Sequence, residues 1–277
     1  MRLLYLLLFL FITNTLFAQS LSESVKSLPF IAGKKEYLNS PFATTGDRLY
    51  LVGHQNGQFP DLGWHISGEM GGIWAHPIKL LDGFHASIEG EDLRSAELFV
   101  NFPMANQHRY QTKNFTILRT QFVPDGIAGC IIEFEIENNT NQAHTTPFVF
   151  QAKSDLRPTW LGERTNMQDR EDQATFEKDH WEFKDAGNPW FTFVGANKQG
   201  IPGAAPIPFA STGNGISKSI NFTIQIPANG KTTIQFFIAG SSKSRNEAEK
   251  AYANLHKNGK LLFQQKWARL HALAEKS

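Results

Sequence analysis

Histidine, tryptophan and carboxylate side chains gather between residues 39 and 85, in a segment that is also rich in glycine. Four of the nine histidines of the chain lie in this segment. Aromatic rings stack on the C–H faces of sugars, and carboxylates and imidazoles form hydrogen bonds with sugar hydroxyls. The segment therefore predicts a surface that binds an oligosaccharide or α-glucan. Its candidate residues are His54, Asp61, Trp64, His65, Glu69, Trp74, His76 and Asp82.

Several of these residues have a second interpretation. Asp61 and Glu69 could be the acid and base of a glycosidase, which needs two carboxylates across a sugar ring. Their glycine-rich surroundings favour turn and capping roles instead. Trp64 and Trp74 fit a sugar-stacking role and a core-packing role equally well.

Other catalytic and cofactor chemistries find no support in the residue pattern. The histidine spacing matches no zinc motif. The run Gly-Glu-Met-Gly-Gly at 68–72 lacks the Lys and Ser or Thr of a phosphate-binding loop, and no Gly-x-Ser-x-Gly elbow is present. Cys130, the single cysteine, precedes an apolar run, which indicates a buried thiol. The sequence predicts no catalytic residue, no metal and no cofactor.

Composition limits the classes of partner. The chain has 277 residues, with 27 Lys plus Arg and 26 Asp plus Glu, so its formal charge is +1. This balance excludes electrostatic binding of nucleic acid as the main function. Hydrophobic residues make up 41% of the chain, which is enough for a large globular core.

Alternation of apolar and polar residues predicts that strands dominate the fold. Ile132, Phe134 and Ile136 alternate with glutamates, which are expected to face water. Residues 220–226 and 232–238 alternate in the same way, and Asn229-Gly230 between them predicts a tight hairpin. Further strands are predicted at 49–52, 96–102, 115–123, 148–153, 181–184 and 190–195, and an extended loop at 201–208. The result is a mainly β fold, a large antiparallel β-sandwich over residues 19–243.

Helices are predicted at the C-terminal end, in residues 244–277. Ser244-Arg245-Asn246-Glu247 has the form of a capping box, which predicts a helix start at Ser244. Asn258-Gly259 is typical of a helix end. Beyond it, Phe263, Trp267, Leu270 and Ala274 fall at helical spacing, which predicts a second helix with an apolar stripe.

The first 18 residues predict a secretory signal peptide. Arg2 precedes a nearly continuous apolar run, and the stretch ends on Ala18. The run is shorter than the roughly 20 residues of a membrane span. Cleavage after Ala18 would place the protein in the periplasm or outside the cell, with no stable span remaining.

Several runs resemble the N-terminal domain of bacterial glycoside hydrolase family 63 enzymes, which are related to mannosyl-oligosaccharide glucosidases and are often described as glycogen-debranching-like. The resemblance rests on residues 40–48, 53–65 and 68–84, and on three shorter runs: Phe-Val-Pro-Asp-Gly-Ile (122–127), Lys-Ser-Asp-Leu-Arg-Pro-Thr-Trp (153–160) and Asn-Pro-Trp-Phe (188–191).

This resemblance implies a supersandwich-like domain followed by linker helices and an inverting (α/α)6 catalytic barrel. The helices at 244–277 would be those linkers, and the barrel would act in cis or in trans. The chain would then be the non-catalytic domain of a secreted α-glucosidase-type enzyme, with the segment at 53–85 facing the barrel. The alternative is a free-standing carbohydrate-binding β-sandwich protein of the periplasm or cell surface.

Overall fold

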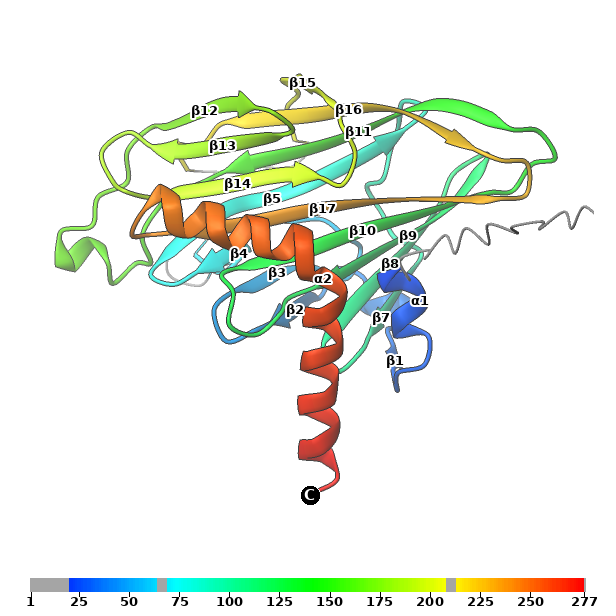
Figure 1. Ribbon diagram of the computed structural model, residues 1–277, viewed down its shortest axis with the longest axis horizontal. Coiled ribbons are helices and arrows are strands. Elements are labelled where there is room, and N and C mark those ends of the chain that lie inside the picture. The colour runs from blue at the N-terminus through cyan, green and yellow to red at the C-terminus, as the bar shows by residue number, and fades with distance from the viewer. Residues whose placement is uncertain (1–19, 64–68, 208–212, 277) are drawn as a thin grey trace, which may run out of the picture.

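A computed structural model describes residues 20–63, 69–207 and 213–276. It confirms a mainly β fold with 17 strands in two antiparallel sheets (Figure 1). The first sheet runs β1 (Ile31–Ala32), β7 (Leu98–Asn101), β8 (Ala105–Gln111), β9 (Phe115–Phe122), β10 (Gly129–Asn138), β17 (Lys231–Ser241), β14 (Phe191–Ala196), β13 (His180–Asp185) and β12 (Asp172–Glu177). The second runs β15 (Ile201–Gly203), β16 (Ser217–Ile226), β11 (His144–Ser154), β5 (Ile78–Ile88), β4 (Gly72–Ala75), β3 (Tyr50–His54) and β2 (Pro41–Thr45), and β6 (Glu91–Asp92) pairs with β5. The helices are α1 (Leu21–Val25), α2 (Arg245–Ala274) and two 3-10 turns at Lys35–Tyr37 and Glu163–Thr165.

The main core lies between the two sheets and is rich in phenylalanine. The rings of Phe150 on β11 and Phe236 on β17 stack across the sheets with centroids 3.9 Å apart. Phe134 on β10 and Phe148 on β11 pack edge to face beside them at 5.3 Å. Aromatic pairs of this kind contribute about 0.5–1.5 kcal/mol beyond the area they bury. The aromatic content of the sequence is therefore used to join the sheets.

The two strands predicted to form a hairpin around Asn229 belong to different sheets. β16 pairs with β11 and β15, whereas β17 pairs with β10 and β14. Asn229 does adopt a positive φ of 50°. The hairpin prediction was wrong because both strands carry a continuous apolar face, and the turn lets those faces meet across the core. Phe222 and Phe236 illustrate this with an edge-to-face contact at 5.7 Å.

Both α-helices cover the outer face of the nine-stranded sheet (Figure 1). The glutamates of β10 were predicted to face water, but Glu133 is completely buried there. Its carboxylate accepts hydrogen bonds from the backbone N–H groups of Leu21 and Ser22 at 2.9 and 2.8 Å. A carboxylate at a helix start satisfies amides that have no partner within the helix. Glu133 thus holds α1 against the sheet.

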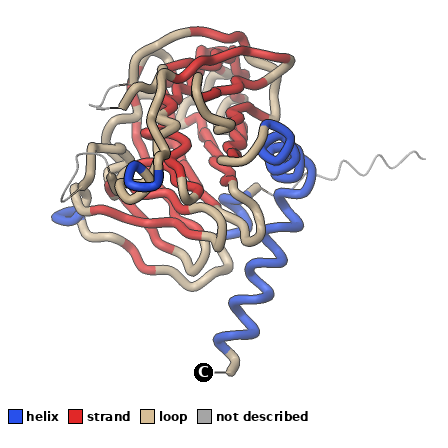
Figure 2. The backbone as a smooth tube through the Cα atoms, turned by 90° about the vertical axis from the view of Figure 1, so that its left-hand side faces the viewer, coloured by secondary structure: helices blue, strands red, loops and turns tan. Residues whose placement is uncertain are grey.

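Helix α2 is a single helix that changes direction, where two helices were predicted. Its start agrees with the capping box, since Glu247 N–H donates to Ser244 Oγ at 3.2 Å. Asn258-Gly259 does not end it. A Cβ at position 259 would lie 2.7 Å from Ile131 Cδ1, so glycine allows the helix to pass close to the sheet. Figures 1 and 2 show the first part of α2 lying along the strands and the last part extending away from them.

The segment at 39–85 contains β2, β3 and β4 and most of β5, of which only the strand at 49–52 was predicted. β4 and most of β5 are buried on both faces, so the alternation that marks a half-buried strand is absent from them. A bulge lies between Ile73 and Trp74 and interrupts the register further. The predicted loop at 201–208 likewise begins with the short edge strand β15.

Candidate functional site

A pocket of about 320 Å³ lies over the outer face of the eight-stranded sheet, beside the ends of β3 and β4. Its lining combines aromatic, apolar and polar side chains. The residues are Tyr50, Glu69, Met70, His76, Thr159, Trp160 and Leu161. Two of the predicted site residues, Glu69 and His76, are among them.

Tyr50 on β3 and His76 in the turn after β4 line one wall of this pocket, and the ring of Trp74 on β4 packs against both of them. Tyr50 and Trp74 occupy paired positions of the two strands, and their rings stack at 6.5 Å with an interplanar angle of 15°. Trp74 is buried, and its Nε1–H donates to the Gly71 carbonyl at 2.9 Å. Tyr50 Oη lies 3.0 Å from His76 Nε2. Trp74 is therefore the packed support beneath the Tyr50 and His76 rings, and partial burial raises the pKa of Tyr50.

The opposite wall comes from the loop after β11. Thr159 N–H donates to the Pro77 carbonyl at 3.0 Å, and Pro158 forms an isolated bridge with Ile78. These backbone contacts fix the loop across the β4–β5 turn. Trp160 then presents its ring at the pocket with 46% of the residue exposed, and the Arg164 guanidinium lies 5.6 Å from the ring centroid. An exposed tryptophan on an anchored loop is well placed to stack on a ligand.

A buried network of charges fixes the strands below the pocket. Lys79 on β5 is 1% exposed, and its ammonium forms ion pairs with Asp82 and, at 3.1 Å, with Asp155. The same ammonium lies 5.6 Å from the Trp74 ring. Burial raises the pKa of Asp82 to about 7, and the nearby Asp155 charge adds to this effect while Lys79 opposes it. Asp82 is thus enclosed among charged partners, and it does not line the pocket.

The remaining predicted residues are spread over the same side of the sheet. His54 ends β3, four residues along the strand from Tyr50, and burial lowers its pKa. Asp61 is half-buried in the following loop and does not line the pocket. Trp64 and His65 lie outside the described residues. Tyr50 and Trp160 were not predicted as pocket residues, although Tyr50 alternates with buried Leu51 and Trp160 ends the run at 153–160.

The pocket has the composition of a binding site more than that of a reaction centre. Glu69 is the only carboxylate among its described lining residues. Within residues 20–63, 69–207 and 213–276, no three His, Cys, Asp or Glu side chains come together as a metal site. Cys130 is buried, and burial raises the pKa of its thiol. Rings with one carboxylate can position a polyhydroxylated ligand, because stacking and hydrogen bonding act on different faces of it.

Comparison with solved structures shows the fold. A protein assigned as a kojibiose phosphorylase from the human microbiome matches with a TM-score of 0.50 and 8% identity, over 83% of this chain and 35% of the other. A protein assigned as an aldose 1-epimerase from Escherichia coli K12 matches with a TM-score of 0.49 and 7% identity, over 73% and 99%. A bacterial glucoamylase complexed with acarbose matches with a TM-score of 0.46 and 9% identity, over 84% and 35%.

No family model matches the sequence, and no curated protein matches it either. This chain spans about a third of the length of the phosphorylase chain it matches. The described β-sandwich therefore shares its fold with part of a longer protein.

No helix among the described residues is both long enough and apolar enough to span a membrane.

Proposed function

We propose that this chain is the N-terminal, non-catalytic β-sandwich domain of a secreted glycoside hydrolase of the α-glucosidase type, similar to family 63. Its partner is a C-terminal (α/α)6 catalytic domain in cis or in trans, and its substrate is an oligosaccharide or α-glucan. Residues 1–18 act as the signal peptide, and the inverting acid and base belong to the barrel. The resemblance over residues 40–191 supports the family, and the apolar run before Ala18 supports secretion.

The observation that carries this proposal is the fold likeness to the kojibiose phosphorylase, which covers 83% of this chain. The described residues form most of a sandwich that, in the other protein, belongs to a chain about three times as long. Helix α2 adds to the argument. Leu261 and Leu273 in the second half of this helix are 51% and 52% exposed, which suits contact with another domain.

Hydrolysis assays test the non-catalytic assignment. The isolated chain should release no glucose from α-glucosides, and it should remain inactive after Asp61→Asn or Glu69→Gln. Hydrolysis by the native chain that either substitution abolishes would overturn the assignment. The mass of the natural secreted protein, detected with an antibody against residues 100–240, tests the partner in cis. A product far heavier than 31.1 kDa supports it, and a product slightly lighter than 31.1 kDa argues for a partner in trans or a free-standing protein.

The pocket itself favours a second candidate, a free-standing carbohydrate-binding protein of the periplasm or cell surface. Tyr50 and Trp160 offer rings to the C–H faces of a sugar, and Glu69 can accept hydrogen bonds from its hydroxyls. Both rings are held by contacts to the scaffold, so little ordering is needed when a ligand binds. A volume of about 320 Å³ is within the range of small-molecule sites.

Calorimetric titration with malto-oligosaccharides and other glucans separates the two candidates. Saturable binding by the isolated chain that Trp160→Ala abolishes supports the binding protein. Trp267→Ala on α2 is the matched control, because Trp267 does not line the pocket. Titrations without heat across the whole panel would rule out the second candidate and leave the domain role as the better explanation of the pocket.

A further inference from the structure

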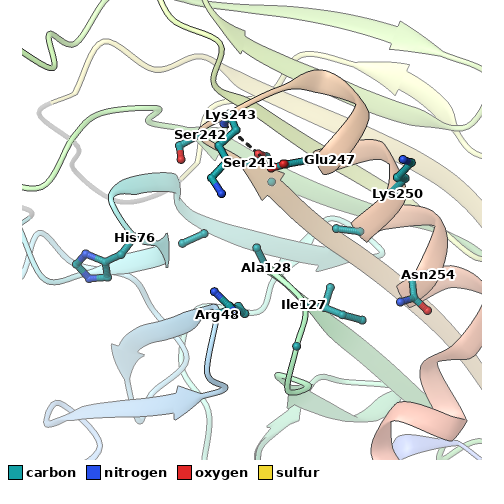
Figure 3. Close-up of a pocket in the computed structure, with 14 residues that line it drawn as sticks. Arg48, His76, Ile127, Ala128, Ser241, Ser242, Lys243, Glu247, Lys250 and Asn254 are labelled. Carbon is teal, nitrogen blue, oxygen red and sulfur yellow. Dashed lines mark hydrogen bonds between the residues drawn. The ribbon is translucent and has the colours of Figure 1, made fainter.

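A second pocket of about 380 Å³ lies on the other side of His76 (Figure 3). It is enclosed by the turn between β2 and β3, the loop between β9 and β10, the end of β17 and the first turns of α2. The N–H of Gly126 donates to Asp47 Oδ1 at 2.6 Å, so the first two of these segments are tied together. The cavity is thus a structured feature of the sandwich and lies outside the aromatic pocket.

Three cationic side chains reach this pocket from three different segments. Arg48 comes from the β2–β3 turn, Lys243 from the loop between β17 and α2, and Lys250 from the second turn of α2. Figure 3 shows Arg48 across the pocket from Ser242 and Lys243. No carboxylate of the described part of the chain forms an ion pair with any of these three cations. Their charges therefore remain available to a ligand.

One carboxylate also lines the pocket, and it is already engaged. Glu247 accepts a hydrogen bond from Ser241 Oγ at 2.9 Å (Figure 3, dashed line). Three cations and one carboxylate leave the described lining with an excess of positive charge. The start of the 30-residue helix α2 adds the positive end of its dipole beside the same cavity. The hydroxyl of Ser242 supplies a neutral donor.

We propose that this pocket binds a phosphate group, either inorganic phosphate or the phosphate of a small ester. Arginine and lysine converging from separate segments surround an anion better than cations on one strand or helix face, because they approach it from several directions. The cavity is enclosed on several sides and the whole chain is nearly neutral, with a formal charge of +1, so a small ligand fits better than a polyanion. His76 borders both pockets, so a sugar phosphate could reach from one to the other.

Isothermal titration of the full chain with inorganic phosphate tests the proposal. We expect saturable binding in the millimolar range or tighter. Arg48→Gln and Lys243→Gln should each weaken binding about tenfold, or about 1.4 kcal/mol, because each removes a charged hydrogen-bond donor. Glu247→Gln should strengthen binding, because it removes a repulsive charge while its amide oxygen can still accept the bond from Ser241. No purely structural role for these residues predicts that gain.

The control is Lys113→Gln, which removes an exposed lysine from the β8–β9 turn, outside the pocket. It should leave phosphate binding unchanged, and a thermal unfolding transition measured for every variant confirms that it is folded.

A parallel titration with glucose 6-phosphate distinguishes the two sources of the phosphate group. Tighter binding of glucose 6-phosphate than of inorganic phosphate identifies the ester, and equal or weaker binding identifies the free ion. Absence of saturable binding to both, or equal affinity in the native chain and Arg48→Gln, would overturn the proposal. Because Arg48 lines this pocket and not the aromatic one, Arg48→Gln should not change the glucan titration, so failure of either idea can be told from failure of the other.

Discussion

The phenol oxygen of Tyr50 lies 3.0 Å from Nε2 of His76, and this contact joins strand β3 to the turn that separates the two pockets. The Tyr50 ring also stacks on Trp74. The orientation of His76 therefore depends on a strand that is distant from it in the sequence.

Tyr50→Phe should keep the ring stack and remove the hydrogen bond to His76. We expect glucan affinity to fall several-fold, because His76 is no longer held, and the free energy of unfolding to fall by about 0.5–1.5 kcal/mol. Calorimetry and urea denaturation measure the two effects. Tyr37→Phe is the control, since Tyr37 is exposed and does not line the pocket. An unchanged glucan affinity in Tyr50→Phe would show that the contact does not organise the site.

The two tryptophans of the site should respond in opposite ways to truncation. Trp160 is 46% exposed and Trp74 is 2% exposed. Trp160→Ala should abolish ligand binding and change the free energy of unfolding by less than about 1 kcal/mol. Trp74→Ala should destabilise the chain by about 3–5 kcal/mol, because it leaves a cavity beneath Tyr50 and removes the bond to Gly71. Comparable destabilisation by both substitutions would contradict this division of roles.

Asp172 should make stability depend on pH. Burial raises its pKa to about 7, while the unfolded value is near 3.8. The native state therefore holds an extra proton between about pH 4 and pH 7, and the free energy of unfolding should fall as pH rises through that window and then level off. Asp82 and Asp169, with pKa values raised to about 7 and about 6, act in the same direction.

Asp172→Asn removes this contribution and keeps an acceptor for the Leu156 N–H, which now donates to Asp172 Oδ2 at 3.1 Å. Relative to the native chain, the variant should gain on the order of 2–3 kcal/mol between about pH 5 and pH 8. Urea denaturation at both pH values measures this, with the exposed Glu97→Gln as control. Parallel pH profiles for the native chain and Asp172→Asn would disprove the role of burial at this site.

The two parts of α2 should contribute unequally to stability. Leu255 is fully buried against the sheet, whereas Leu273 is 52% exposed. Leu255→Ala should cost about 2–5 kcal/mol of the free energy of unfolding. Leu273→Ala should change it by no more than about 0.5 kcal/mol. Equal losses in chemical denaturation would mean that the end of the helix is packed as firmly as its beginning.

The sequence predicted those strands whose residues alternate between apolar and polar types. β10, β16 and β17 carry this alternation, although the glutamates Glu133 and Glu135 on the polar face of β10 are buried as well. The sequence also predicted the start of α2 at Ser244, because a capping box depends only on residues within one turn. Strands β4 and β5 were not predicted. Both of their faces are covered, and their residues do not alternate between apolar and polar types.

Local chemistry therefore decided which residues form strands, where α2 begins and which segment carries rings and carboxylates. Tertiary structure decided the rest. It placed β16 and β17 in opposite sheets, because their apolar faces gain more by meeting across the core than by lying side by side. It buried Trp74 and exposed Trp160, and it brought Arg48 to Lys243 and Lys250. These relationships join residues far apart in the chain, and only the packing of the two sheets and α2 fixes the distances between them.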